Sequence, residues 1–129
     1  MKTTRLVLAV MTSFALDTEA GTRERLEACR QKIDSLDQRI VALIQQRAQV
    51  VEEVGRIKRE AQLPVTVASR EKQVIENAQG LAKGGPLPAD AVGRIYQKLV
   101  EEMRNWEAKL EAAATPRSSG QRATTSGSQ

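Results

Sequence analysis

The sequence predicts an all-α protein whose chain forms three helices in the order long, short, long. Two observations carry this prediction. Apolar residues recur every three or four positions through residues 22–61, with no proline among them, which is the spacing of a helix with one apolar face. No segment of the 129 residues shows the alternation of apolar and polar side chains that is typical of a strand.

The first predicted helix covers residues 22–61 and carries a heptad repeat. Thr22 offers a start and Pro64 an end. One position of the repeat holds Leu26, Ile33, Ile40, Val54 and Ala61, and the partner position three residues later holds Cys29, Leu36, Leu43, Val50 and Ile57. At 1.5 Å per residue this helix would be about 60 Å long.

A helix of that length does not fit inside a compact monomer of about 90 ordered residues, whose radius of gyration would be about 12 Å. Its apolar seam therefore needs a partner. We expect a six-helix homodimer in which the long helices of two copies share the seam.

Two further helices follow the first. The second is predicted over residues 69–82, with Ser69 as its N-cap. The third is predicted over residues 88–113, with Pro88 near its start and Asp90 in its first turn. Its apolar seam, in which Tyr96 and Trp106 are expected to be core residues, consists of Val92, Tyr96, Leu99, Met103, Trp106 and Leu110.

The two ends of the chain are predicted to lie outside the domain, which covers residues 22–114. Residues 115–129 contain no large apolar side chain and are predicted to be disordered. Residues 1–21 are predicted to be an extension that is either disordered or a signal peptide, since Lys2 and Arg5 precede an apolar run of six residues. The protein is expected in the cytoplasm, or in the periplasm if residues 1–15 direct export.

The composition excludes several kinds of chemistry. The chain has no His and one Cys, so a His acid or base, a zinc cluster and an internal disulfide are excluded. The net charge of +4 comes from Lys2, Arg5, Arg117 and Arg122, because residues 11–114 hold 16 basic and 16 acidic residues. We therefore expect neither nucleic acid nor a membrane as a partner, and neither a metal nor another cofactor.

Charged residues interrupt the seam of the first helix. Arg47 occupies a heptad position at which neighbouring heptads hold Ile or Val, and a guanidinium there must be paired or bound. Lys58 lies about three turns from Arg47, so the two side chains point to nearly the same side. Arg30 lies some 25 Å before Arg47 along the helix, and it could join the same site only from an antiparallel partner chain.

The remaining candidates are Arg70 and Glu71 in the second helix and Glu107 in the third. Cations and carboxylates without a His or a nucleophile suit the binding of a small dianion. Arg binds carboxylates with two hydrogen bonds, and Lys offers a point charge to a developing oxyanion. A polar residue in a seam can also simply fix helix register, so a non-catalytic helical dimer that acts as a regulatory partner module is an alternative.

These residues together resemble the all-helical, AroQ-class chorismate mutase family over about residues 24–110. The positions that carry the resemblance are Arg30, Ile33, Asp34, Asp37, Gln46, Arg47, Val54, Gly55, Lys58, Pro64, Arg70, Glu71, Trp106 and Glu107. A mild departure is Cys29, which precedes Arg30 where the family has Leu. The resemblance implies an intertwined dimer with two active sites, each completed by Arg30 of the other chain. These sites would convert chorismate to prephenate in the biosynthesis of phenylalanine and tyrosine.

The resemblance also implies a role for each residue of the site. Arg47 would hold a carboxylate of chorismate, and Lys58 would donate to the ether oxygen whose bond breaks. Arg70 and Glu71 would complete the wall on the side of the carboxylate and the ring hydroxyl. Glu107 would face the same ether oxygen, and it must be protonated to donate a hydrogen bond, which burial favours.

Two positions depart from the family pattern. Val67 stands three residues before Arg70, where many members have an acid that contacts the substrate hydroxyl, and Met103 stands where a Ser is common. The missing acid predicts modest activity. Some short members without it work with a partner, the first enzyme of the shikimate pathway, so the resemblance allows such a complex here.

Isochorismate–pyruvate lyases share the fold and the cationic site and are the nearest alternative function. They usually have Gln at the position of Glu107 and a more apolar loop before the second helix. Glu107 and the loop of residues 65–70 therefore favour the mutase.

Overall fold

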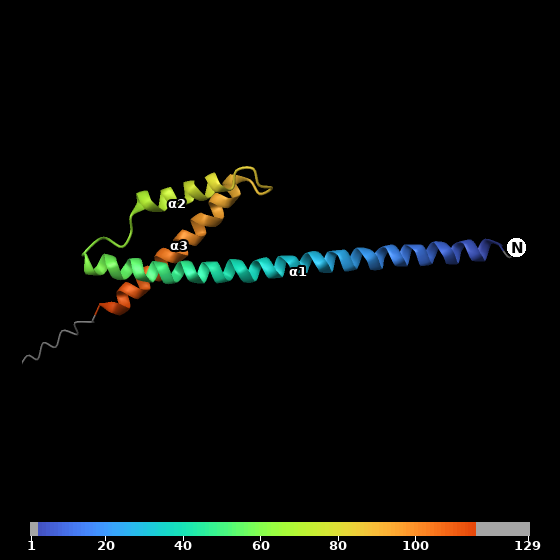
Figure 1. Cartoon of the computed structure of the whole chain (residues 1–129), viewed down its shortest axis with the longest axis horizontal. Coiled ribbons are helices and arrows are strands. Elements are labelled where there is room, and N and C mark those ends of the chain that lie inside the picture. Colours follow the sequence, from blue (N-terminus) through green and yellow to red (C-terminus); the bar gives the residue numbers. More distant parts are fainter. Residues whose placement is uncertain (1–2, 116–129) are drawn as a thin grey trace, which may run out of the picture. The chain divides into compact units, whose positions relative to one another are not determined.

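The computed structural model describes residues 3–115, with side chains described from residue 18 onward. Within that part the chain forms three helices and no strand: α1 (Thr3–Glu60), α2 (Ala68–Leu81) and α3 (Ala89–Ala114) (Figure 1). The predicted all-α class and the long, short, long order are confirmed. None of the helices in the described part has an apolar stretch long enough to cross a membrane.

The first helix begins earlier than predicted, because α1 is already helical at Thr3. The hydroxyl of Thr22 donates a hydrogen bond to the carbonyl oxygen of Thr18, one turn earlier, at 2.9 Å. This is the bond of a Thr inside a helix rather than of an N-cap, so the prediction that Thr22 starts the helix is wrong. The predicted disordered tail falls almost entirely on residues 116–129, which lie outside the described residues, and the domain limits at 22 and 114 stay predictions.

A tight turn closes α1 shortly before Pro64. Gln62 adopts a left-handed backbone conformation with a φ of 56°, and the N–H of Leu63 donates to the carbonyl oxygen of Lys58 at 2.8 Å. This pattern is typical of helices that end on a left-handed residue. The turn reverses the chain, so that the backbone of Val65 returns to the side chain of Lys58.

The chain divides into two compact units, residues 1–46 and 47–129. In the described part of the first unit, α1 exposes most of the apolar side chains of the predicted seam, and Cys29 is exposed with them. The exposed large apolar residues of this unit are Leu26, Ile33, Leu36, Ile40, Val41, Leu43 and Ile44. Such a row of apolar side chains on a helix surface is typical of a face that binds another chain.

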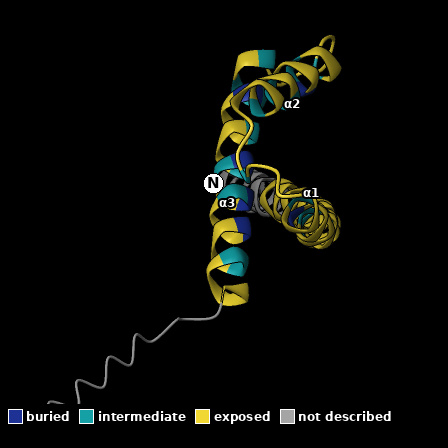
Figure 2. Cartoon of the chain, turned by 90° about the vertical axis from the view of Figure 1, so that its left-hand side faces the viewer, coloured by how far each residue is buried: buried dark blue, intermediate teal, exposed yellow. Residues whose placement is uncertain are grey.

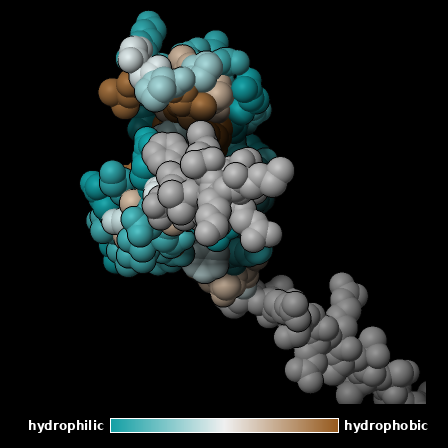
Figure 3. All heavy atoms as spheres, turned by 90° about the vertical axis from the view of Figure 1, so that its right-hand side faces the viewer, coloured by the Kyte–Doolittle hydropathy of each residue, from teal (hydrophilic) through white to brown (hydrophobic). Residues whose placement is uncertain are grey.

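The second unit consists of the last turns of α1 together with α2 and α3, and its core is small. Its buried apolar side chains are Ala78, Val100 and Met103, which lie on α2 and α3 (Figure 2). Hydrophobic residues also reach the surface in the part formed by α2 and the start of α3 (Figure 3), where Leu81 and Ile95 are exposed. Glu107 is the only buried charged residue in the described part.

Two local predictions are wrong. α2 begins at Ala68, with Val67 as its N-cap and with no side-chain cap, so Ser69 lies inside the helix. Trp106 is 39% exposed rather than part of the core, and its indole Nε1 donates to the carboxylate of Glu52 on α1 at 3.2 Å. A Trp ring keeps one polar group that needs such a partner.

The start of α3 matches its prediction more closely. Asp90 lies in the first turn, after the N-cap Pro88. Arg94 donates to Asp90 at 2.9 Å, and this hydrogen bond and the charge of Arg94 lower the pKa of the Asp90 carboxyl from its ordinary value. The carboxylate therefore stays negative at the helix N-terminus, where the helix dipole favours a negative charge.

Candidate functional site

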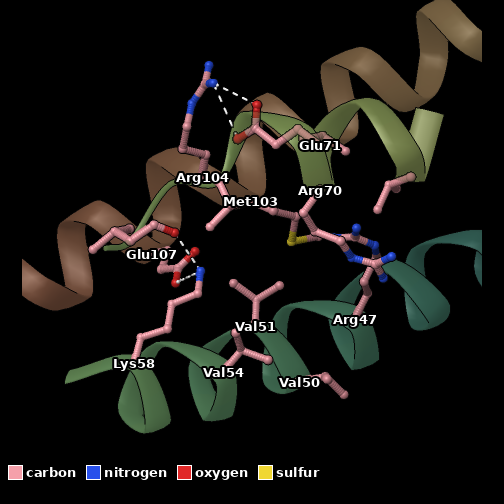
Figure 4. A pocket seen from close by; sticks show the side chains of 14 residues that line it. Arg47, Val50, Val51, Val54, Lys58, Arg70, Glu71, Met103, Arg104 and Glu107 are labelled. Carbon is pink, nitrogen blue, oxygen red and sulfur yellow. Dashed lines mark hydrogen bonds and ion pairs between the residues drawn. The ribbon is translucent and has the colours of Figure 1, made fainter. Parts of the chain in front are cut away.

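A cavity of about 350 Å³ lies between the last turns of α1, the beginning of α2 and the second half of α3 (Figure 4). Its volume is within the range of about 300–1,000 Å³ that is usual for small-molecule sites. The residues that line it are Arg47, Val50, Val51, Val54, Lys58, Val65, Val67, Arg70, Glu71, Val74, Val100, Met103, Arg104 and Glu107. The cavity therefore combines an apolar wall with six charged side chains.

The α1 wall of the cavity is one face of the helix. Arg47, Val51, Val54 and Lys58 follow one another at intervals of three or four residues, which places them above one another along the helix. Figure 4 shows Arg47 near one end of the cavity and Lys58 near the other. Arg47 and Lys58 therefore line the same cavity, and their roles toward a substrate stay predictions.

Lys58 on α1 and Glu107 on α3 form an ion pair at one end of the cavity. Nζ of Lys58 lies 3.0 Å from Oε1 of Glu107, and 21% and 10% of their side chains are exposed. The same ammonium donates to the carbonyl oxygen of Val65. Since an ammonium has three N–H donors, the two protein acceptors fix its position and leave one donor available to a ligand in the cavity.

Gly55 allows Glu107 to approach the backbone of α1. Gly55 is buried, and a Cβ atom placed there would lie 3.4 Å from Cγ and 3.6 Å from Oε1 of Glu107. The Cβ of an Ala would make ordinary van der Waals contact at these distances, whereas a side chain with atoms beyond Cβ would meet the carboxylate. The glycine of the predicted motif thus helps to keep Glu107 beside Lys58.

Arg47 and Arg70 supply the uncompensated charge of the cavity. Nη1 of Arg70 donates to the amide oxygen of Gln73 at 2.7 Å, and Arg47 has no hydrogen bond or ion pair with any residue of the described part. Neither guanidinium has a carboxylate partner within the described residues. Guanidinium groups bind carboxylates with two parallel hydrogen bonds, so this end of the cavity can hold a dicarboxylate.

Glu71 lies in the cavity wall and is bound by Arg104. Nη1 of Arg104 donates to Oε2 of Glu71 at 3.0 Å and to Oε1 at 3.4 Å. Sequence reasoning missed Arg104, although it stands directly after Met103 and one turn before Glu107, on the face of α3 that carries both. The pair joins α2 to α3 at the rim of the site.

Val67 and Met103 also line the cavity. Met103 is 7% exposed and belongs to the core, so it packs against the site rather than contributing a polar contact. Val67 is the N-cap of α2, and its side chain offers neither a donor nor an acceptor. The polar contacts that the family pattern places at these two positions are therefore absent from this wall.

Arg30 does not line the described cavity. It lies on the first unit of α1, where its side chain is 70% exposed and Nη1 lies 3.7 Å from the carboxylate of Glu27. Its contribution to the site of a second copy stays a prediction.

The fold has a counterpart among solved structures. The structure of chorismate mutase (Form II) from Thermus thermophilus superposes with a TM-score of 0.62, at 24% sequence identity, over 66% of this chain and 96% of that chain. At this identity the likeness shows a common fold.

Curated relatives share the sequence over most of the domain. The bifunctional chorismate mutase/prephenate dehydratase of Aquifex aeolicus is 33% identical over 93 residues, which are 70% of this chain and 26% of that protein. The chorismate mutase of Methanocaldococcus jannaschii is 31% identical over 78 residues, which are 60% of this chain and 79% of that protein. This chain thus spans about a quarter of the length of the bifunctional relative.

The family itself is shown by the match of residues 29–108 to chorismate mutase type II. That range contains every residue that lines the cavity, and it also contains Arg30. The resemblance stated from the motifs is confirmed, and the chain belongs to the chorismate mutase type II family.

Proposed function

We propose that this protein is a chorismate mutase that converts chorismate to prephenate. The observation that carries the proposal is the charge arrangement of the cavity. Arg47 and Arg70 have no carboxylate partner within the described residues and match the two carboxylates of the substrate, while Lys58 and Glu107 lie together at the other end. The family of the chain supports the same activity.

The reaction needs only that the substrate is held in the right conformation and that a positive charge or donor faces its ether oxygen. The ether C–O bond breaks while a C–C bond forms between the enolpyruvyl group and the ring, and every atom stays in the product. The cavity would hold the substrate in its compact conformation, with Arg47 and Arg70 on the carboxylates. Lys58 would donate to the ether oxygen as negative charge develops there, and a well-placed donor of this kind is worth about 10²–10³ in rate.

Glu107 would assist Lys58 as a second donor to the ether oxygen. In the structure its carboxylate accepts a hydrogen bond from Lys58, so it must take up a proton to donate one.

We further propose that the active form is a homodimer. The apolar residues that α1 exposes, among them Leu26, Ile33, Leu36 and Leu43, would form the seam between two copies. Arg30 of one copy would then reach the cavity of the other. Sedimentation at micromolar concentration is expected to give twice the mass of the chain, and a monomer at all concentrations would contradict the dimer.

We propose the cytoplasm as the location, since the apolar run after Lys2 and Arg5 is short for a signal peptide. Cell fractionation together with sequencing of the mature N-terminus tests this. A product that lacks the first residues and lies in the periplasm would contradict it.

Product identification tests the proposed function. Purified protein is mixed with chorismate, and in a second sample with isochorismate, and the products are followed by proton NMR. Prephenate from chorismate is the expected result. If the protein releases pyruvate from isochorismate and leaves chorismate unchanged, it is a lyase. If neither substrate changes, the result favours a non-catalytic partner module.

Replacement of Val67 by Asp is expected to increase turnover severalfold. Val67 lines the cavity at the N-cap of α2, and an Asp there would offer an acceptor for the substrate hydroxyl. It would also cap the helix, which is worth about 1 kcal/mol. The measurement is kcat and KM for chorismate.

Val67→Asn is the matched control, because Asn caps a helix as well as Asp does but carries no charge. A gain in Val67→Asp that Val67→Asn does not share supports the role of the carboxylate. Equal turnover in Val67→Asp and the parent would show that the missing acid does not limit this enzyme. In that case, chorismate turnover is measured again after the first enzyme of the shikimate pathway is added, which tests whether the lack of a partner limits the rate.

A further inference from the structure

Arg104 is the one charged residue of the cavity lining that the sequence motifs did not predict. It lies on α3 and bonds both carboxylate oxygens of Glu71 on α2, at 3.0 and 3.4 Å from Nη1. In Figure 4 the Glu71 carboxylate is turned toward Arg104 and away from Arg47 and Arg70. All four side chains line the same cavity.

We propose that Arg104 is a positioning residue that holds Glu71 away from Arg47 and Arg70. The inference rests on the proposed function and adds to it a reason why the cavity keeps two guanidinium groups available for substrate carboxylates. Arg104 itself would not touch the substrate.

The charges of the cavity support this role. Its lining contains four cations and two carboxylates, and the two carboxylates are each bound by a cation, Glu107 by Lys58 and Glu71 by Arg104. Arg47 and Arg70 line the same cavity as Glu71. Without Arg104, the Glu71 carboxylate would be free to turn to one of these guanidinium groups, since neither has a carboxylate partner within the described residues and opposite charges attract. A substrate carboxylate would then have to displace it.

The exposure of the Arg104–Glu71 ion pair indicates that it contributes little to the stability of the fold. The side chains of Arg104 and Glu71 are 42% and 26% exposed, and ion pairs so accessible to water contribute little to the stability of a fold. The loss of Arg104 should therefore show in substrate binding rather than in unfolding.

Arg104→Gln is expected to raise KM for chorismate about tenfold, which is the loss of roughly one charge-assisted hydrogen bond, with kcat nearly unchanged. The melting temperature should stay within a few degrees of the parent. Arg104→Lys keeps the charge and is expected to recover most of the affinity. The matched control is Arg94→Gln. Arg94, like Arg104, lies on α3 and pairs with a carboxylate, that of Asp90, but it lies outside the cavity.

A double variant separates this role from a direct one. In Arg104→Gln the added change Glu71→Gln removes the carboxylate that would neutralise Arg47 and Arg70, so it should lower KM again. In the parent the same Glu71→Gln change should raise KM, because Glu71 belongs to the wall of the cavity. A further rise of KM in the double variant would mean that Arg104 contacts the substrate directly, and it would overturn the proposal.

Binding can be followed apart from turnover, because Trp106 is the single Trp of the chain and adjoins Glu107. Titration of its fluorescence with prephenate should show weaker binding in Arg104→Gln and restored binding in the double variant. If both variants bind prephenate as tightly as the parent and the parent converts chorismate, the proposed role of Arg104 is overturned while the proposed function stands. A parent that neither binds prephenate nor converts chorismate overturns the proposed function as well.

Discussion

Replacing Lys58 with Ala is expected to lower kcat/KM for chorismate by about 10²–10³-fold, the usual loss when a donor to a developing oxyanion is removed. Lys58 is held by Val65 and Glu107, so its ammonium is placed before the substrate arrives. Arg47→Ala is expected to cause a loss of similar size through substrate binding, because Arg47 has no other partner within the described residues. The measurement is the loss of chorismate absorbance under steady-state conditions.

The controls separate chemistry from folding. Lys58→Ala leaves the buried Glu107 without its partner, which costs stability, whereas Arg47→Ala breaks no contact of the described residues. Circular dichroism should therefore show unchanged helical content at least in Arg47→Ala. Lys98→Ala serves as the matched Lys control, since Lys98 is exposed on α3 and pairs with Glu101 and Glu102. Activity within a few-fold of the parent in either site variant would refute the assignment of the cavity.

Glu107→Gln is expected to keep kcat/KM for chorismate within a few-fold of the parent, because the amide N–H of Gln can donate to the ether oxygen as the proposed role of Glu107 requires. Glu107→Ala has no donor at this position and is expected to lower kcat/KM by about 10²-fold. The measurement is kcat/KM for chorismate of both variants under the conditions used for the parent.

Equal losses of activity in Glu107→Gln and Glu107→Ala would contradict a donor role for Glu107 and would show that it acts only as the partner of Lys58. Lys58 would then be the single donor to the ether oxygen.

The sequence contained enough information for the helices and for the α1 side of the site. The spacing of Arg47 and Lys58 fixes their common direction, because an α-helix has a constant rise and turn per residue. The heptad positions likewise identified an apolar face that the single chain leaves exposed. These predictions depended on geometry within one helix, which local periodicity determines.

The errors concern contacts between helices and the exact ends of helices. Ser69 is a good cap by residue type, yet α2 begins one residue earlier, at Ala68. Trp106 fits the apolar seam of α3, but its indole reaches Glu52 on α1. The partnership of Arg104 with Glu71 depends on how α2 and α3 pack, and no spacing along the chain reveals it.

We propose that the cavity is a chorismate mutase site that a second copy completes with Arg30. Arg30→Ala and Arg47→Ala are produced separately and together in one cell, and the chorismate turnover of each purified sample is measured. Each variant alone should be nearly inactive. In the mixture half of the dimers carry one chain of each kind, and one of their two sites combines an intact Arg30 with an intact Arg47, so about one quarter of the parent activity should return. Activity no higher than that of the separate variants would contradict a site shared between two chains.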